Sequence, residues 1–88
     1  MPYNSEMTNS DRANRAHSTL LTYVEDDGRM GEVAARETTN VEEATQDLIC
    51  DLIHLLRSVG GEVEGVIRRA RASNREELEE ERFANQEG

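Results

Sequence analysis

The chain has 88 residues, of which 19 are acidic and 10 are basic, so its formal net charge is −9. This length allows at most one domain, and the acidity argues against general nucleic-acid binding, because affinity for phosphates comes mainly from Lys and Arg. The single cysteine excludes an internal disulfide. No apolar run approaches the roughly 20 residues that a membrane-spanning helix needs, and no signal peptide is visible. We therefore expect a cytoplasmic protein without membrane contact.

The first predicted helix follows a polar segment, residues 1–9, which we expect to be a disordered tail. Ser10 followed by Asp11 is typical of a helix N-terminus with an acidic residue in its first turn. Apolar residues then recur at helical spacing, and the Asp26-Asp27-Gly28 sequence ends the pattern. The sequence predicts a helix from about Asp11 to Glu25.

Residues 28–40 give the weakest signal. A strand here would need a pairing partner, and the sequence contains no second strand-like run. We predict a loop with one helical turn between Gly31 and Glu37.

The second main helix is predicted to begin at Thr39, where Thr39 and Glu42 fit the capping-box pattern. It should end at Ser58 or Val59, because the following Gly60-Gly61 pair favours a C-terminal cap. A third helix should open with Glu62 and run to about Phe83. The short connection predicts an antiparallel helical hairpin.

The second main helix carries more apolar surface than the roughly 100° stripe of an ordinary surface helix. Its candidate interface residues are Leu48, Ile49, Leu52, Ile53, Leu55, Leu56 and Val59. So broad a face needs partners on two sides, and the chain offers few residues to cover it. We therefore predict an all-α fold: a single domain at residues 10–83, built as a three-helix unit with an antiparallel hairpin and completed as a bundle by homodimerisation. Residues 84–88 are expected to fray.

A polar row on the same helix is the first candidate for chemistry. Asp47, Asp51 and His54 stand at i, i+4 and i+7 and therefore line one face, and Glu43 extends the row by one turn. The two carboxylates and the imidazole could hold a divalent cation, with Glu43 as a further ligand; the carboxylates favour Mg²⁺ or Mn²⁺, and the imidazole favours Zn²⁺. The alternative, which we favour, is that the row is the polar face of an amphipathic helix and that no cofactor is bound.

Cys50 lies inside the most apolar segment, where we expect a core or interface residue rather than a nucleophile. His54 is four residues further on, within reach for a Cys–His pair. Cys50 is in mid-helix, however, so the helix dipole would not favour a thiolate. We predict no catalytic residues.

A second candidate is the basic group formed by Arg68, Arg71 and Arg75 on one face of the third helix, which could bind a partner's phosphate or carboxylate. The simpler interpretation is a solvated face with intrahelical pairs from Glu64 to Arg68 and from Arg75 to Glu79. The acidic run after Arg75 is usually just a solvated helix end. Acids along a helix can also occupy a basic groove that normally binds nucleic acid.

Residues 41–75 resemble a group of small helical proteins encoded by phages, prophages and plasmids. Their pattern is DLxxDLxH followed by a short turn and an amphipathic helix. The matching residues are Asp47, Leu48, Asp51, Leu52 and His54. The resemblance implies a mobile-element context and no established activity.

The same region is similar to the second half of the all-α nucleotide pyrophosphohydrolases (MazG-like enzymes). That resemblance implies Mg²⁺ ligands at Glu43, Asp47 and Asp51. The enzymes also carry an ExxE pair on the preceding helix, which this chain lacks, and their second acidic pair is spaced by three residues rather than four.

The function expected from the sequence is that of a small acidic, non-enzymatic interaction or regulatory protein. Its expected partners are a second copy and an unidentified protein with a basic surface, and an inhibitor that mimics nucleic-acid charge belongs to this class. The alternative is a Mg²⁺-dependent hydrolase of the pyrophosphohydrolase type.

Overall fold

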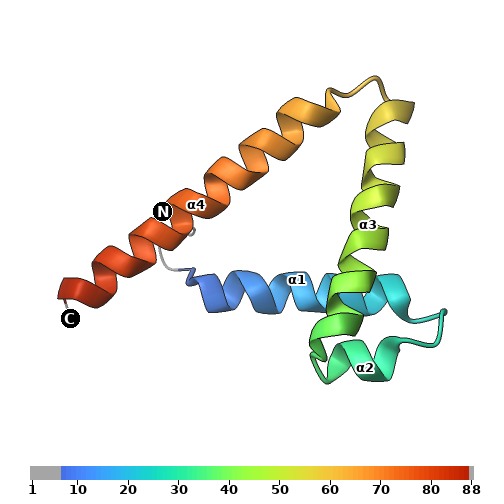
Figure 1. Cartoon of the computed structure of the whole chain (residues 1–88), viewed down its shortest axis with the longest axis horizontal. Coiled ribbons are helices and arrows are strands. Elements are labelled where there is room, and N and C mark those ends of the chain that lie inside the picture. Colours follow the sequence, from blue (N-terminus) through green and yellow to red (C-terminus); the bar gives the residue numbers. More distant parts are fainter. Residues whose placement is uncertain (1–6, 88) are drawn as a thin grey trace.

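The computed structural model describes residues 7–87, and within this part it contains four helices and no strand (Figure 1). The helices are α1 (Asn9–Val24), α2 (Met30–Ala34), α3 (Thr38–Ser58) and α4 (Val63–Glu87). The all-α prediction is confirmed, and α2 is the helical turn expected within residues 28–40. No helix among the described residues combines the length and the apolar character needed to cross a membrane.

Helix α1 begins two residues earlier than predicted, because the N-cap is Thr8 and not Ser10. The backbone N–H of Asp11 donates to Thr8 Oγ1 at 3.0 Å, and the N–H of Thr8 donates to Asp11 Oδ2 at 3.1 Å. This reciprocal pair is a capping box with aspartate in the usual Glu or Gln position. Thr8 and Asn9, which we expected in the tail, therefore belong to the start of this helix.

The capping box predicted at Thr39 and Glu42 is wrong, because α3 begins directly after a tight turn that closes α2. Arg36 has φ = 59° there, and its N–H donates to the Val33 carbonyl while that of Glu37 donates to the Glu32 carbonyl. This is a Schellman motif, with arginine in the place where glycine is usual. It makes Glu37 the N-cap of α3, with no side-chain hydrogen bond, and places Thr39 already inside the helix.

The predicted cap at the end of α3 is confirmed. Gly60 adopts φ = 73°, its N–H donates to the Arg57 carbonyl at 3.1 Å, and the N–H of Gly61 donates to the Leu56 carbonyl at 2.7 Å. These are the two hydrogen bonds of a Schellman motif. Helix α4 begins at Val63, one residue after the predicted start, and the Glu62 carboxylate just before it accepts from the Gly65 N–H at 2.7 Å.

Replacing Gly60 with alanine is expected to lower the free energy of unfolding by about 1–2 kcal/mol, since a Cβ in the left-handed region is strained. Gly31 is the matched control: its φ is not positive, and an added Cβ would meet nothing within 4 Å. Gly31→Ala should be neutral or slightly stabilising. Urea unfolding followed by circular dichroism measures both, and equal midpoints for the two variants would contradict the assigned turn.

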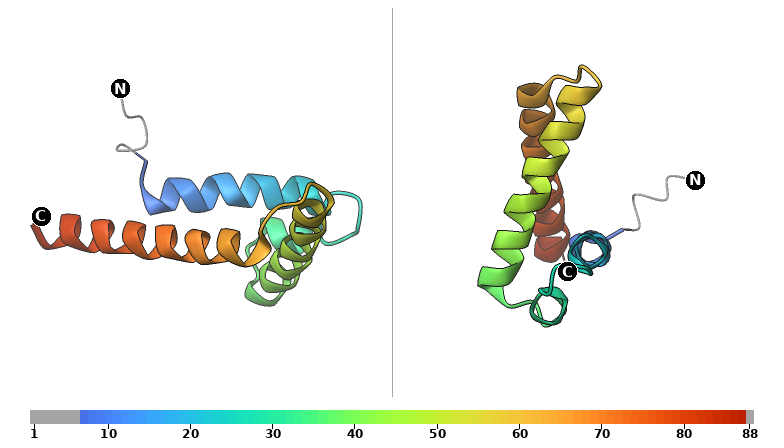
Figure 2. Two further views of the ribbon diagram at one scale, coloured as in Figure 1. Left: turned by 90° about the horizontal axis from the view of Figure 1, so that it is seen from above. Right: turned by 90° about the vertical axis from the view of Figure 1, so that its right-hand side faces the viewer.

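Helices α1, α3 and α4 form the three sides of an open triangle (Figures 1 and 2). The chain reverses direction at residues 59–62, but α3 and α4 diverge from this turn instead of packing along their lengths. The far half of α4 returns to the start of α1. There Arg12 Nε lies 3.2 Å from Glu77 Oε2, and Asn9 Nδ2 donates to the Glu77 carbonyl at 3.1 Å.

The hydrophobic core lies at the corner where α1, α2 and the first half of α3 meet. Its buried side chains are Leu20, Val24, Val33 and Ala44, and the partly buried residues packed around them are Leu21, Tyr23, Val41 and Leu48. Val63 is buried separately, beside the α3–α4 turn. A core this small leaves the second half of α3 outside it.

Candidate functional site

The aspartates of the polar row face the end of α1 and the loop that follows it. Arg29 Nη1 donates to Asp47 Oδ2 at 3.0 Å, and the hydroxyl of Tyr23 donates to Asp51 Oδ2 at 2.5 Å. Arg29 also binds Asp27, with Nη2 2.6 Å from Oδ2. The two aspartates thus tie α3 to the preceding segment, as a polar face of a packed helix would.

The other members of the row do not join this cluster. Glu43 and His54 are exposed, and neither makes a side-chain hydrogen bond among the residues that the structure describes. Within those residues no group of three His, Cys, Asp or Glu side chains is placed to hold a metal ion. Arg29 and Tyr23 each occupy the Oδ2 atom of one of these aspartates.

These contacts shift the titration of three groups. The hydrogen bond to Asp51, with smaller contributions from desolvation and from the charge of Asp51, raises the pKa of Tyr23 from 10.0 to about 12. Hydrogen bonds from Arg29 lower the pKa of Asp27. Hydrogen bonds to Asp27 and then to Asp47 raise the pKa of Arg29, which stays protonated at any working pH.

The Tyr23 shift predicts how stability depends on pH. Because its pKa is raised in the folded state, the hydrogen bond to Asp51 contributes fully below pH 10 and is lost as the pH rises towards 12. We expect the tyrosinate absorbance of a Tyr3→Phe chain to titrate well above pH 10 in the folded protein. Asp51→Asn should return the midpoint towards 10, and a midpoint of 10 already in the Tyr3→Phe chain would contradict the contact.

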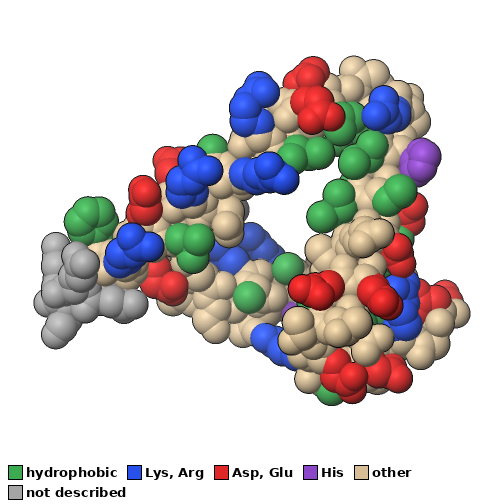
Figure 3. Space-filling model, viewed as in Figure 1, with side chains coloured by type: hydrophobic (Ala, Val, Ile, Leu, Met, Phe, Trp, Pro, Cys, Tyr) green, Lys and Arg blue, Asp and Glu red, His purple; other side chains and the backbone are tan. Residues whose placement is uncertain are grey.

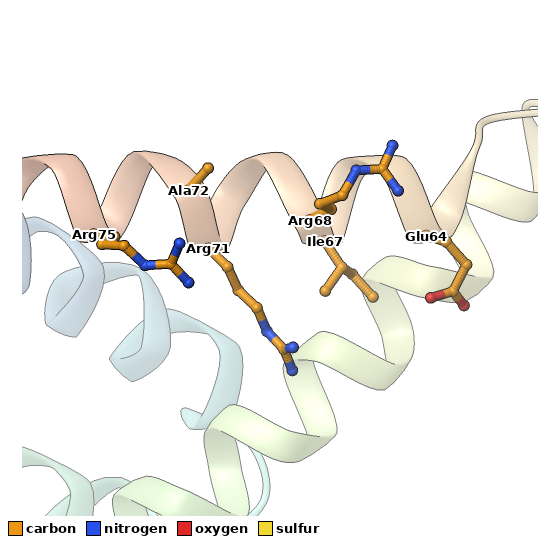
Figure 4. Close-up of a pocket in the computed structure, with 6 residues that line it drawn as sticks. All are labelled: Glu64, Ile67, Arg68, Arg71, Ala72 and Arg75. Atoms are coloured by element: carbon orange, nitrogen blue, oxygen red, sulfur yellow. The ribbon is translucent and has the colours of Figure 1, made fainter.

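The arginine group on α4 does not converge on one point. Arg68, Arg71 and Arg75 line a shallow hollow together with Glu64, Ile67 and Ala72 (Figure 4). The side chains of Arg71 and Ile67 point towards α3, whereas that of Arg68 points away from it. The predicted pairs from Glu64 to Arg68 and from Arg75 to Glu79 are not among the ion pairs that join residues 7–84. This part of α4 therefore presents positive charge that its own helix leaves unneutralised.

The predicted interface residues of α3 divide into two groups. Leu48, Ile53 and Leu56 are half-buried. Four others stay exposed, with these fractions of their surface accessible: Ile49 48%, Leu52 47%, Leu55 58% and Val59 71%. We call these four residues the α3 apolar face. Figure 3 shows hydrophobic side chains gathered on α3 and α4 around the opening of the triangle. Cys50, expected in a core or interface, is exposed.

Sequence reasoning missed one further feature, a groove of about 460 Å³ between α1 and α3. Its walls are mainly apolar, formed by Ala13, Ala16, Leu20, Val41 and Leu48, with the polar residues His17, Arg36, Thr38, Glu42 and Thr45 around them. The guanidinium of Arg36 donates to Asn14 Oδ1 at 2.7 Å and to His17 Nδ1 at 3.3 Å. His17 Nε2 therefore carries the proton and donates to the Val33 carbonyl at 2.8 Å. The sequence offers one sign of this groove, the position of His17 beside the apolar residues of α1. It gives no sign that Arg36 lines the groove.

Comparison with protein-family models, with curated proteins and with solved structures gave no match for this chain. The resemblances to phage-encoded helical proteins and to the all-α nucleotide pyrophosphohydrolases therefore stay predictions.

Proposed function

We propose that this chain is a small, non-enzymatic interaction protein that binds another polypeptide through the α3 apolar face. The observation that carries the proposal is the exposure of four large aliphatic side chains on one side of one helix. An apolar stripe along α3 begins with Val41, Ala44 and Leu48, which pack in or against the core. The α3 apolar face continues this stripe towards the C-terminus of the helix. A contiguous apolar surface of this kind marks an interaction site in a small acidic protein.

The surface is large enough to favour association. Complete burial of an aliphatic side chain contributes about 1.5–3 kcal/mol, and each of these four residues keeps roughly half of its area in water. Covering the α3 apolar face therefore contributes about 4 kcal/mol before the entropic cost of association is subtracted.

The net charge of −9 adds a preference among partners. It attracts surfaces that carry basic residues around an apolar contact and repels acidic ones. The exposed acidic residues of α4, including Glu76, Glu79, Glu80 and Glu81, belong to this field. An inhibitor of a nucleic-acid-binding protein from a mobile element would fit the same description, and it stays a prediction from the sequence.

We do not propose the hydrolase. Asp47 and Asp51, which would be its metal ligands, bind Arg29 and Tyr23 instead, and α1 contributes no carboxylate to the same cluster.

A photo-crosslinking experiment tests the proposal. With p-benzoylphenylalanine in place of Leu55 in the native host, irradiation should produce protein adducts. The same probe in place of Cys50, which is exposed on the other side of α3, should produce few. Equal adduct yields at the two positions, or none at Leu55, would refute the proposal.

A further inference from the structure

The loop that follows α1 contains a dipeptide with a chemistry of its own. Asp27-Gly28 is the only Asp-Gly pair in the chain. The backbone nitrogen of a glycine attacks the carboxyl group of a preceding aspartate more readily than that of a larger residue, because no side chain blocks the approach. Both residues are exposed, and Gly28 has φ = 89°. The pair is therefore open to a reaction that the proposed function does not use.

The reaction converts aspartate to isoaspartate without a net change of atoms. The Gly28 nitrogen forms a bond to Cγ of Asp27, and the carboxyl OH leaves with the amide proton as water, which gives a cyclic succinimide. Water then adds to the main-chain carbonyl carbon of Asp27, and the original peptide C–N bond breaks. The main chain now runs through Cγ, and the former main-chain carbonyl is the free carboxylate.

In the folded chain Arg29 holds the Asp27 carboxylate at both oxygens. The N–H of Arg29 donates to Oδ1 at 3.1 Å, and the guanidinium donates to Oδ2 from Nε at 3.1 Å and from Nη2 at 2.6 Å. The N–H of Asp27 donates to the Val24 carbonyl at 3.1 Å. A carboxylate held by these hydrogen bonds is not free to turn towards the Gly28 nitrogen.

The same contacts keep the carboxyl group in its unreactive form. Only the neutral acid can release its OH group as water. Hydrogen bonds from Arg29 lower the pKa of Asp27, so the neutral fraction at neutral pH is smaller than in a chain without these contacts. Both the orientation and the charge of the side chain thus act against the reaction.

From these contacts we propose that Asp27-Gly28 is a site of spontaneous isoaspartate formation and that Arg29 protects it in the folded chain. The protection depends on the position of the Arg29 side chain, which also donates to Asp47 of α3 at 3.0 Å. The inference is independent of the proposed function, because it concerns the loop and not the α3 apolar face.

Ageing the full-length chain at neutral pH, in buffer and in guanidinium chloride, tests the site. The tryptic peptide of residues 16–29 contains Asp26 and Asp27 but no asparagine, so deamidation does not interfere. Chromatography separates the isomers, and electron-transfer fragmentation locates the isoaspartate. In the unfolded chain we expect accumulation at Asp27 and much less at Asp26, which precedes a larger residue. In buffer, accumulation at Asp27 should be several-fold slower.

A pair of variants separates the role of Arg29 from general loosening of the loop. Arg29→Gln removes the guanidinium contacts with both Asp27 and Asp47, whereas Asp47→Ala removes only the contact with α3. In buffer, Arg29→Gln should age at Asp27 several-fold faster than the unmodified chain, and Asp47→Ala at nearly the unmodified rate. Equal ageing of the two variants would overturn the protective role of Arg29. Equal accumulation at Asp26 and Asp27 in the unfolded chain would overturn the site itself.

Discussion

Replacing Leu55 with aspartate is expected to abolish the homodimer that the sequence predicts, while leaving the single chain folded. Leu55 is 58% exposed and lies outside the core, so a carboxylate there stays hydrated in the monomer. In the predicted homodimer the same carboxylate would be buried at the interface without a partner. Burial of an unpaired charge costs about 3 kcal/mol or more. Two copies of the substitution would weaken the dissociation constant roughly ten-thousandfold.

Sedimentation velocity over a wide concentration range measures this effect, and far-ultraviolet circular dichroism shows whether the helices remain. The matched control is Cys50→Asp, which adds the same charge to the exposed outer side of α3. That variant should sediment as a dimer. An unchanged dissociation constant for Leu55→Asp would exclude the α3 apolar face from the interface.

Sequence reasoning succeeded where the signal is local. The period of apolar residues indicated α1, α3 and α4, and Gly60 indicated a C-terminal cap because only glycine adopts φ = 73° there without strain. The sequence-based prediction failed where a residue adopted a backbone conformation that its type rarely takes. Arg36 takes the left-handed conformation that glycine normally supplies, and this moved the start of α3 ahead of the predicted capping box.

In the candidate site, too, the local arrangement was predictable from the sequence, whereas the contacts with distant residues were not. Helical spacing correctly aligned Asp47 and Asp51 on one face of α3, but their partners Tyr23 and Arg29 come from another part of the chain. No period in the sequence connects them, because the intervening loop and α2 determine where these side chains reach. The contact between α4 and the start of α1 likewise joins two residues that are far apart in sequence, Arg12 and Glu77.

Because the core is small, the second large effect is the loss of stability that a single truncation in it causes. Leu20 is 6% exposed and belongs to the only cluster of buried residues that joins α1, α2 and α3 among the described residues. Replacing a buried leucine with alanine costs about 2–5 kcal/mol, because contacts are lost and a cavity remains. A domain of this size has roughly 5 kcal/mol of stability in total. Leu20→Ala should therefore keep at most about 3 kcal/mol of stability, and its thermal midpoint should fall by about 10 °C or more.

Leu78→Ala provides the matched control, because it removes the same atoms from a side chain that is 51% exposed on α4. Its cost should be below about 1 kcal/mol, since a half-solvated site leaves little cavity. Thermal unfolding of both variants should be compared at one protein concentration, because dimer formation makes the midpoint depend on concentration. If the two variants unfold at the same temperature, the corner of α1, α2 and α3 is not what holds the chain together.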